Sequence, residues 1–344
     1  MTGRGEGPAY RRILLIRTDR VGDLVLSTPA IASFRRSWPN ARIEALITDY
    51  TEPVLRHSPD VDAVHALSQA RLRSDGRAIA RTLGEGADIA VALAPRTQDY
   101  VLASSTRAPR RIGYVYQRRY LSRIAARLLL TSHAVSEADP ELADRYPDRP
   151  VSHEVRQVQE LVRLAGGHEL VDDLVLRVAS DDEAFARERV RAGSLALNLA
   201  PRWFMPNFGY EATVQLIARL VALQRDVLIT YGNDVPDAAA RIRDAVRAPN
   251  VTWLGELPLL RWAAALARCS VVVTVDTGAT HVASAMGVPT VVVFEREYYR
   301  LCSQEWAPWN VPNVMMRKAR SGAGTPKLVE DVAAAAIALA GRPG

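Results

Sequence analysis

The chain has very little cysteine: Cys269 and Cys302 are the only two among its 344 residues. Two cysteines alone allow neither a disulfide framework nor a thiolate metal site, so both of these classes are excluded. Long apolar runs are also absent, since none approaches the roughly 18 residues of a membrane-spanning helix. The first nine residues are polar and rich in glycine, which predicts no signal peptide. Together these absences predict a cytoplasmic protein.

Lysine is nearly absent as well. Only Lys318 and Lys327 are lysines, so all but two of the 44 basic residues are arginine, in a chain of net charge +6. Arginine suits bidentate binding of phosphate and carboxylate groups. A GC-rich genome would produce the same bias, so composition alone does not choose between these two explanations.

The arginines are unevenly spread. Residues 107–127 contain no acidic residue and seven arginines, namely Arg107, Arg110, Arg111, Arg118, Arg119, Arg123 and Arg127. Such a run most often forms a solvated face. Binding of nucleic acid is a second interpretation, but the interleaved tyrosines match no nucleic-acid-binding module, and we predict no nucleic-acid partner. A third is contact with an anionic acceptor and with an anionic membrane surface.

Short apolar runs alternate with helical segments along the chain. Strands are predicted at residues 13–16, 43–47, 61–67, 89–93 and 111–114, and again at 195–200, 227–231, 251–253, 271–275 and 290–294. This alternation of apolar strands and helices predicts parallel sheets covered on both faces. A chain of this length favours two such doubly wound α/β domains. We expect them at residues 1–175 and 176–325, with a helix in residues 326–344 packing back across the seam.

The most informative stretch is VVVTVDTGATHVASAMGVPTVVVF, at residues 271–294. An apolar strand ends at Val275, Asp276-Thr277-Gly278 forms a turn, and an alanine-rich helix carrying His281 follows. Free N–H groups at a helix N-terminus, together with the helix dipole, favour a bound anion such as phosphate. The alternative is an ordinary strand–turn–helix unit in which Asp276 or Thr277 caps the helix and His281 lies on its surface.

A second turn follows the first predicted strand. Residues 17–23 read RTDRVGD, and a helix is expected to begin near Thr28 and Pro29. In open α/β sheets, ligands bind at the carboxyl ends of the strands, which is where this turn lies. Gly22 permits close approach of a ligand, and Asp23 could accept a proton from a substrate hydroxyl. The alternative is that Asp23 caps the following helix.

Taken together, the two turns resemble the ADP-heptose lipopolysaccharide heptosyltransferases, glycosyltransferase family 9. The first has the pattern Arg-x-Asp-x-x-Gly-Asp with a later proline, at residues 17–29, and the second has Asp-Thr-Gly-x-x-His with a later Gly-x-Pro, at residues 276–289. Arg-Ile-Gly-Tyr at residues 111–114 and His-Glu-Val at residues 153–155 fall in the family's order. Each motif alone is modestly specific, whereas the ordered set over residues 11–296 is strong.

The resemblance implies a GT-B fold, in which two Rossmann-like domains face a central cleft. It implies an inverting, metal-independent glycosyltransferase that needs no cofactor and takes a nucleotide diphosphate sugar, typically ADP-heptose, as donor. Asp23 would be the general base, and Asp276, Thr277, Gly278 and His281 would bind the donor's phosphates. Asp234 or Asp237 would bind the ribose, although turn and capping chemistry also explains these two residues. Gly22 and the arginines 107, 110, 111, 118 and 119 would contact an anionic glycan or glycolipid acceptor, with peripheral contact to the membrane.

One departure from the family pattern concerns the donor phosphates. The family usually has a lysine after the first strand of the second domain, where this sequence has Pro206. Both lysines lie beyond residue 317, so we expect none of them nearby, and Arg202 is the nearest cation in sequence. A different donor, a reorganised phosphate site or reduced activity would each explain the change.

Two other functions share these features. A sugar-nucleotide epimerase can have the same architecture but needs no acceptor. A catalytically degenerate relative would bind nucleotide or glycan without turnover. No cluster of metal ligands is evident, because Asp60-Val61-Asp62 is better explained as a turn and His153-Glu154 lacks the second histidine of a zinc-protease helix.

Overall fold

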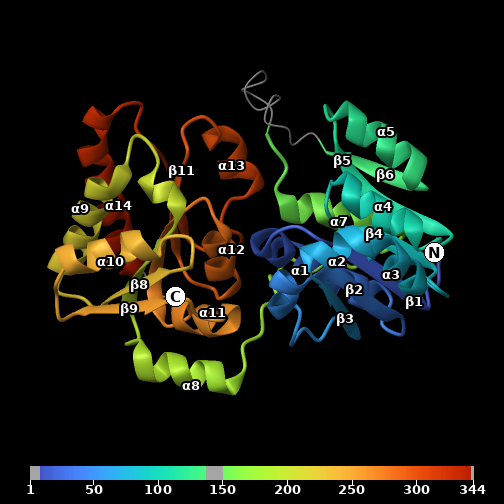
Figure 1. Ribbon diagram of the computed structural model, residues 1–344, viewed down its shortest axis with the longest axis horizontal. Coiled ribbons are helices and arrows are strands. Elements are labelled where there is room, and N and C mark those ends of the chain that lie inside the picture. The colour runs from blue at the N-terminus through green and yellow to red at the C-terminus, as the bar shows by residue number, and fades with distance from the viewer. Residues whose placement is uncertain (1–7, 137–149, 342–344) are drawn as a thin grey trace, which may run out of the picture. The chain divides into compact units, whose positions relative to one another are not determined.

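The computed structural model describes residues 8–136 and 150–341 and divides the chain into two compact units, Met1–Arg177 and Val178–Gly344. The division falls beside the boundary predicted from the sequence. Each unit contains one six-stranded parallel sheet with helices on its faces (Figure 1). The doubly wound α/β class, with two Rossmann-like domains as in the GT-B fold, is therefore confirmed.

The sheet of unit 1 has the strand order β3-β2-β1-β4-β5-β6. Helices α1 and α7 pack together in one layer, and α3, α4 and α5 pack side by side in another. The elements are β1 (Arg12–Arg17), α1 (Val21–Ser37), β2 (Arg42–Thr48), the 3-10 helix η1 (Asp49–Val54), β3 (Ala63–Leu67), α2 (Gln69–Ser74), α3 (Gly76–Leu83), β4 (Ile89–Ala92), α4 (Thr97–Ser105), β5 (Arg110–Tyr116), α5 (Tyr120–Leu129), β6 (Ser132–Ser136) and α7 (Glu154–Ala165).

The sheet of unit 2 has the order β12-β11-β10-β7-β8-β9. Its elements are α8 (Ser180–Arg189), β7 (Ser194–Leu199), η2 (Pro201–Phe204), α9 (Gly209–Ala222), β8 (Val227–Tyr231), α10 (Pro236–Ala245), β9 (Val251–Gly255), α11 (Leu259–Leu266), β10 (Cys269–Val275), α12 (Gly278–Ala285), β11 (Thr290–Phe294), α13 (Tyr299–Glu305), β12 (Asn313–Arg317), η3 (Gly322–Gly324) and α14 (Thr325–Ala340).

The central strands are buried along nearly their whole length. All six residues of β7 (SLALNL) and all five of β11 (TVVVF) are buried, including the polar Ser194, Asn198 and Thr290. Strands covered by helices on both faces need no solvent-facing polar side, which fits the apolar run of β11. The edge strands β6 and β12 were missed from the sequence because their residues are mostly only half-buried and SHAVS is not an apolar run.

The C-terminal helix α14 belongs to the core of unit 2. It packs on α9, β10 and β11, and Leu328, Val329 and Val332 are part of the cluster that also contains Leu216 and Val273. Residues 326–341 are therefore an integral layer of the second domain and not a separate piece. The predicted packing of this helix across the seam stays a prediction.

The start of α1 differs from the sequence-based expectation. The helix begins at Val21 and not near Thr28, and Pro29 lies inside it. Proline cannot donate the helical hydrogen bond to the carbonyl four residues earlier. Here the hydroxyl of Thr28 donates to that carbonyl, Val25 O, at 2.7 Å, and also accepts the Val175 N–H at 2.8 Å. The helix can therefore continue through the proline, and Gly22 and Asp23 lie in its first turn.

We predict that Thr28→Val lowers the stability of unit 1 by about 1–3 kcal/mol, because it preserves the side-chain shape but removes the partner of the buried Val25 carbonyl and of the part-buried Val175 N–H. The matched control is Ser105→Ala, which removes a hydroxyl that donates to Val101 O at 2.8 Å in a helix without proline. Urea unfolding of both variants measures the difference. Equal losses would contradict the role assigned to Thr28.

Candidate active site

A buried arginine organises the carboxyl end of β1. Arg17, the last residue of this strand, is 2% exposed. A guanidinium has five N–H donors, and a buried one is tolerated only when they are paired. All five are used: Nε and Nη2 donate to the two Asp19 carboxylate oxygens, Nη2 also donates to Glu154 Oε1, and Nη1 donates to Ser27 Oγ and Leu93 O.

Asp23 lies next to Arg17 but accepts no hydrogen bond from it. Its carboxylate is 3.9 Å from Arg17 Nη2, which is too far for a hydrogen bond, and its side chain is 23% exposed. Burial raises the pKa of Asp23 to about 7, and the nearby Asp19 carboxylate adds to the rise, whereas the Arg17 cation opposes it. A carboxylate with a pKa near neutrality suits a general base. The residue preceding α1, Arg20, is its N-cap and makes no side-chain capping bond, so the alternative in which Asp23 is the cap is wrong.

Some residues that support this site come from motifs that the sequence analysis used only for the family resemblance. Tyr114, from the Arg-Ile-Gly-Tyr segment, donates its hydroxyl to Glu154 Oε1 at 2.8 Å, and Glu154 comes from the His-Glu-Val segment. Asp99 is fully buried, accepts from the Thr18 hydroxyl, and has a pKa raised to about 7, mainly by burial. Sequence reasoning assigned no role to Arg17, Glu154 or Asp99, although Arg17 and Glu154 lie within the motifs that carried the resemblance.

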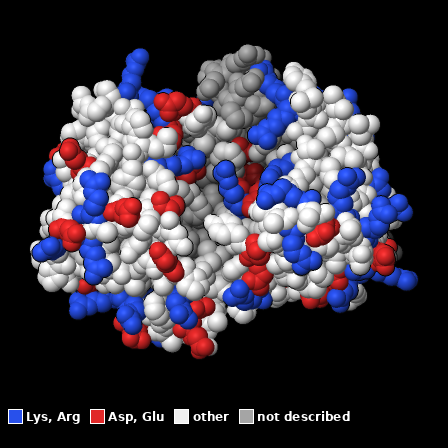
Figure 2. Space-filling model, in the orientation of Figure 1, with Lys and Arg blue, Asp and Glu red and all other residues white. Residues whose placement is uncertain are grey.

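The predicted acceptor arginines are not gathered in one place. Arg110 donates to Ala165 O and Leu164 O at the end of α7, and Arg111 donates to Leu129 O and Ala108 O, so both hold backbone carbonyls. Arg119 lies over the ring of Tyr116 with its Cζ 4.6 Å from the centroid. Figure 2 shows basic side chains spread over the face in view and interspersed with acidic ones.

The remaining acceptor residues lie elsewhere. Arg107 is exposed after α4, and Arg118 is half-buried after β5. Gly22 is buried in the first turn of α1, one residue from Asp23. Of the predicted acceptor contacts, Gly22 is therefore the one placed directly beside the predicted base.

In unit 2 the Asp-Thr-Gly turn lies where the sequence places it. Strand β10 ends at Val275, and α12 begins at Gly278 with Thr277 as its N-cap. The Thr277 side chain makes no capping bond to the helix; its hydroxyl lies 3.3 Å from Val275 O. The first N–H groups of α12 are therefore not consumed by a side-chain cap, and an anion can accept them.

Arg202 and Asp276, both predicted to bind the donor, form an ion pair. Arg202 Nη1 donates to Asp276 Oδ2 at 3.0 Å, although these residues are 74 positions apart. Arg202 is 36% exposed. The pair holds the guanidinium beside the start of α12 with other donors still available. A carboxylate repels phosphate, so the geometry favours Asp276 as the group that orients Arg202.

The expectation that no lysine lies near Arg202 is wrong. Lys318, directly after β12, is 1% exposed and donates to Arg202 O and, at 2.7 Å, to Glu295 Oε1. Strands β10, β11 and β12 pair in parallel, so the carboxyl end of β12 lies on the same side of the sheet as that of β10. The missed β12 explains the error. Lys318 therefore binds groups inside the unit, and its hydrogen bond to Arg202 O fixes the backbone at Arg202.

The other predicted donor residues differ in burial. His281, in the first half of α12, is buried. Asp234 and Asp237 are exposed at the end of β8 and in the first turn of α10, where ribose hydroxyls could reach them. Glu256 follows β9 with a left-handed backbone (φ +53°). With its amide turned to donate, Asn233 lies 3.0 and 3.1 Å from the Glu256 carboxylate oxygens.

The described ranges contain no group of three or more histidines, cysteines, aspartates or glutamates placed to hold a metal ion. Metal independence stays a prediction, as does the absence of a cofactor.

The raised pKa of Asp23 predicts that the free energy of unfolding falls as the pH rises. Because an unfolded aspartate titrates near 3.8 and the folded one near 7, the native state binds the proton more tightly, and its stability falls as pH rises between these values. Asp23→Asn should therefore be more stable than the wild type at pH 8, with the advantage vanishing below about pH 4. Denaturant unfolding at several pH values measures this.

The matched control is Asp19→Asn, which disturbs two hydrogen bonds to the buried Arg17. It should lose about 1.5–3 kcal/mol at pH 8. If both variants lose stability alike, Asp23 is a structural partner of Arg17 and not a strained carboxylate.

Comparison with known proteins agrees with the predicted resemblance. Residues 206–328 match the family described as glycosyltransferase family 9 (heptosyltransferase). Lipopolysaccharide heptosyltransferase 3 of Escherichia coli is 21% identical over 312 residues, 84% of each chain.

Two solved structures share the fold over nearly the whole chain. The family 9 glycosyltransferase of Veillonella parvula superposes with a TM-score of 0.79 at 18% identity, covering 98% of this chain and 99% of that one. The E. coli ADP-heptose lipopolysaccharide heptosyltransferase II gives a TM-score of 0.71 at 18% identity, covering 95% and 99%. These matches confirm the resemblance to glycosyltransferase family 9 and support a heptosyltransferase-like enzyme.

Proposed function

We propose that the protein transfers a sugar, in the first instance a heptose from ADP-heptose, to a hydroxyl group of an anionic glycan such as a lipopolysaccharide core. The reaction proceeds with inversion and without a metal ion. The family match and the relatives named for ADP-heptose and lipopolysaccharide support this choice of donor and acceptor.

The contrast between carboxylates around Arg17 is the observation that carries the proposal. Asp19 and Glu154 accept its hydrogen bonds, whereas Asp23 stands 3.9 Å away with a pKa near 7. Asp23 takes the proton of the acceptor hydroxyl while that oxygen attacks the anomeric carbon of the donor. The anomeric carbon–oxygen bond to the diphosphate breaks in the same step.

The departing diphosphate gains negative charge, which needs nearby cations or N–H donors. Arg202, oriented by Asp276, and the first turn of α12 supply these groups. Thr277 and Gly278 belong to this phosphate site, and Asp234, Asp237 or Glu256 bind the ribose hydroxyls. The acceptor side of the reaction uses unit 1, where Gly22 allows close approach beside Asp23.

Asp23→Asn is expected to lower turnover by at least about 100-fold, the usual scale for loss of a general base. Affinity for ADP should be unchanged, because the proposed donor site lies in unit 2. In the wild type, kcat/KM should fall as pH drops below about 7, since the carboxyl group is then protonated. Steady-state kinetics with ADP-heptose and a lipopolysaccharide-core acceptor measure both quantities.

The matched control is Asp75→Asn, an exposed carboxylate before α3, which should retain full activity. Near-normal turnover of Asp23→Asn would remove the assignment of the base. Conversion of the nucleotide sugar in the absence of any acceptor would show an epimerase instead. Binding of ADP-sugar without turnover under any condition would show a degenerate relative.

Arg202→Ala is expected to weaken ADP binding by about 1.5–3 kcal/mol, the range for hydrogen bonds to a charged group, while adenosine binding changes little. Arg219→Ala is the matched control, because Arg219 also pairs with a carboxylate at 3.0 Å, on the exposed surface of α9. Titration calorimetry with both ligands separates the effects. Unchanged ADP affinity would assign the phosphate site to other residues.

A further inference from the structure

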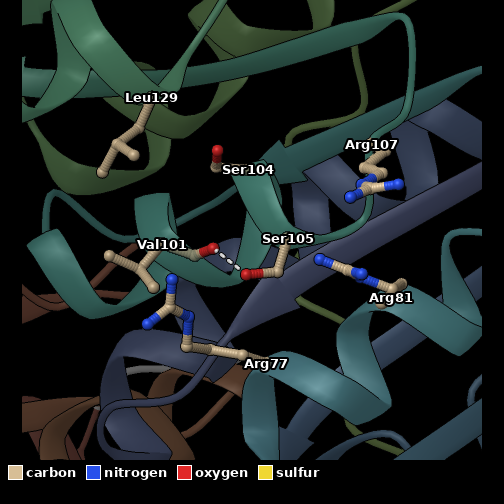
Figure 3. Close-up of a pocket in the computed structure, with 7 residues that line it drawn as sticks. All are labelled: Arg77, Arg81, Val101, Ser104, Ser105, Arg107 and Leu129. Carbon is tan, nitrogen blue, oxygen red and sulfur yellow. Dashed lines mark hydrogen bonds between the residues drawn. The ribbon is translucent and has the colours of Figure 1, made fainter.

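Three arginines meet at a pocket of unit 1 that takes no part in the proposed reaction. The pocket lies between α3 and α4, has a volume of about 240 Å³, and is lined in part by Arg77, Arg81, Arg107, Ser104 and Leu129. In Figure 3 the guanidinium groups of Arg77 and Arg81 reach from α3 toward α4, and Arg107 approaches from the loop after α4. The described residues that line it include no carboxylate. We call it the α3–α4 pocket.

The three guanidinium groups have no partner of their own. Each of these arginines is exposed, and within residues 8–136 and 150–341 none of their side chains forms a hydrogen bond or an ion pair. Arg110 and Arg111, which follow Arg107 closely in the sequence, instead donate to backbone carbonyls. The donors of Arg77, Arg81 and Arg107 therefore remain available to a ligand.

The two arginines of α3 are placed against the local preferences of a helix. Arg77 and Arg81 are four residues apart, so they are neighbours on one face, where two like charges destabilise a helix. Arg77 also lies in the first turn, where the helix dipole disfavours a cation. An anion bound between the two side chains would reverse both effects.

Arg107 also departs from a local preference. Its backbone is left-handed (φ +58°), and its N–H donates to Ser104 O at 3.2 Å directly after the end of α4. Glycine is the usual residue at such a position, because a side chain is strained there. The end of α4 therefore needs no arginine. Departures from local rules that gather at one place are typical of functional sites.

The frame of the α3–α4 pocket is closely packed. Gly76 begins α3 and Gly84 directly follows it. A Cβ atom on Gly84 would lie 2.2 Å from Thr106 O, and one on Gly76 would lie 3.3 Å from a Leu102 methyl carbon. Both ends of α3 thus approach α4 as closely as glycine allows. This contact holds the end of α3 beside the loop that carries Arg107.

The topology separates the α3–α4 pocket from the proposed base. Strands β1, β4 and β5 pair in parallel. Arg81 lies in the last turn before β4 and Arg107 in the loop before β5, so both are near the amino ends of these strands. Asp23 follows the carboxyl end of β1. A small anion in the pocket and an acceptor at Asp23 are therefore different ligands at opposite edges of the sheet.

We propose that the α3–α4 pocket is a second anion site, which binds a small organic phosphate such as the phosphate monoester of a polyol. Guanidinium groups bind phosphate oxygens in pairs, and the Ser104 hydroxyl adds a donor. Leu129 gives the carbon part of the ligand an apolar wall. The pocket is smaller than the roughly 300–1,000 Å³ of sites for drug-sized ligands, which fits a small solute. The inference does not depend on the proposed donor or reaction.

The test is titration calorimetry of the full chain with glycerol 3-phosphate, at an ionic strength held constant with chloride. Saturating ADP fills the proposed donor site, and Arg202→Ala titrated without ADP removes that site in a second way. Both samples should bind glycerol 3-phosphate saturably, inorganic phosphate should compete, and glycerol should not bind. Arg77→Gln with Arg81→Gln should lower the affinity by about tenfold or more, because two charge-assisted contacts are lost.

Arg107→Gly separates binding from stability. It should weaken binding of glycerol 3-phosphate about threefold or more, because one guanidinium is lost. The urea midpoint should not fall, because glycine adopts the left-handed backbone without strain. An arginine that served only the fold would show the opposite pattern, with a lower midpoint and unchanged affinity.

Arg243→Gln with Arg247→Gln is the matched control, since it removes two exposed arginines of the same spacing at the end of α10. It should bind glycerol 3-phosphate like the wild type, and circular dichroism verifies the fold of each variant. Equal losses in the test and control pairs would reduce the effect to net charge and overturn the proposal. So would wild type that binds neither glycerol 3-phosphate nor inorganic phosphate, including the case in which it binds only vesicles of phosphatidic acid.

Discussion

The pairing of the buried Arg17 guanidinium is the interaction on which the arrangement of unit 1 depends. A charge in the interior is tolerated only when every donor has a partner, and a missing partner costs several kcal/mol. Arg17 meets this requirement with groups from the β1–α1 turn, from α1, from the end of β4 and from α7. Four parts of the chain are thereby fixed around one cation. Asp23 is the nearby carboxylate that accepts no hydrogen bond from Arg17, and burial, with the neighbouring Asp19 carboxylate, raises its pKa.

Unit 2 also contains an arginine paired with a carboxylate, but this arginine is not fully buried. Arg202 also lies at the carboxyl edge of a parallel sheet and also pairs with a carboxylate, Asp276. It remains partly exposed, so its other donors are available to a ligand, whereas those of Arg17 are all used internally. The buried Lys318 fixes the backbone of Arg202 through its carbonyl oxygen. Arg17 thus holds together the residues around Asp23, whereas Arg202 keeps donors that a ligand can reach.

Helix α5 shows a different relation between sequence and fold. Ala125 and Ala126 of this helix pack in the core of unit 1, whereas Leu121, Ile124 and Leu128 are exposed to solvent. Nothing in the packing of unit 1 needs those outer side chains. The run of arginines at residues 107–127 also divides in the structure, since Arg110 and Arg111 hold backbone carbonyls while Arg107 and Arg127 stay exposed. Charge counting along the sequence could not separate these roles, because they depend on which carbonyls lie within reach.

Short-range patterns in the sequence were sufficient to predict the two-domain architecture. The buried strands, their alternation with helices and the Asp-Thr-Gly turn before α12 were all predictable, because strand burial and helix termini leave signals within a few neighbouring residues. The half-exposed edge strands β6 and β12 left no such signal, and α1 began earlier than its proline suggested because a threonine hydroxyl replaced the missing N–H. The sequence by itself determined two doubly wound domains and named Asp23, Arg202 and Asp276 as candidates. Only the tertiary structure decided that Arg17 and Glu154 hold the first site, that Asp276 orients Arg202, and that Lys318 lies beneath it. Those contacts join residues 74 to 137 positions apart, and parallel strands bring such residues to one edge only when the whole sheet has formed.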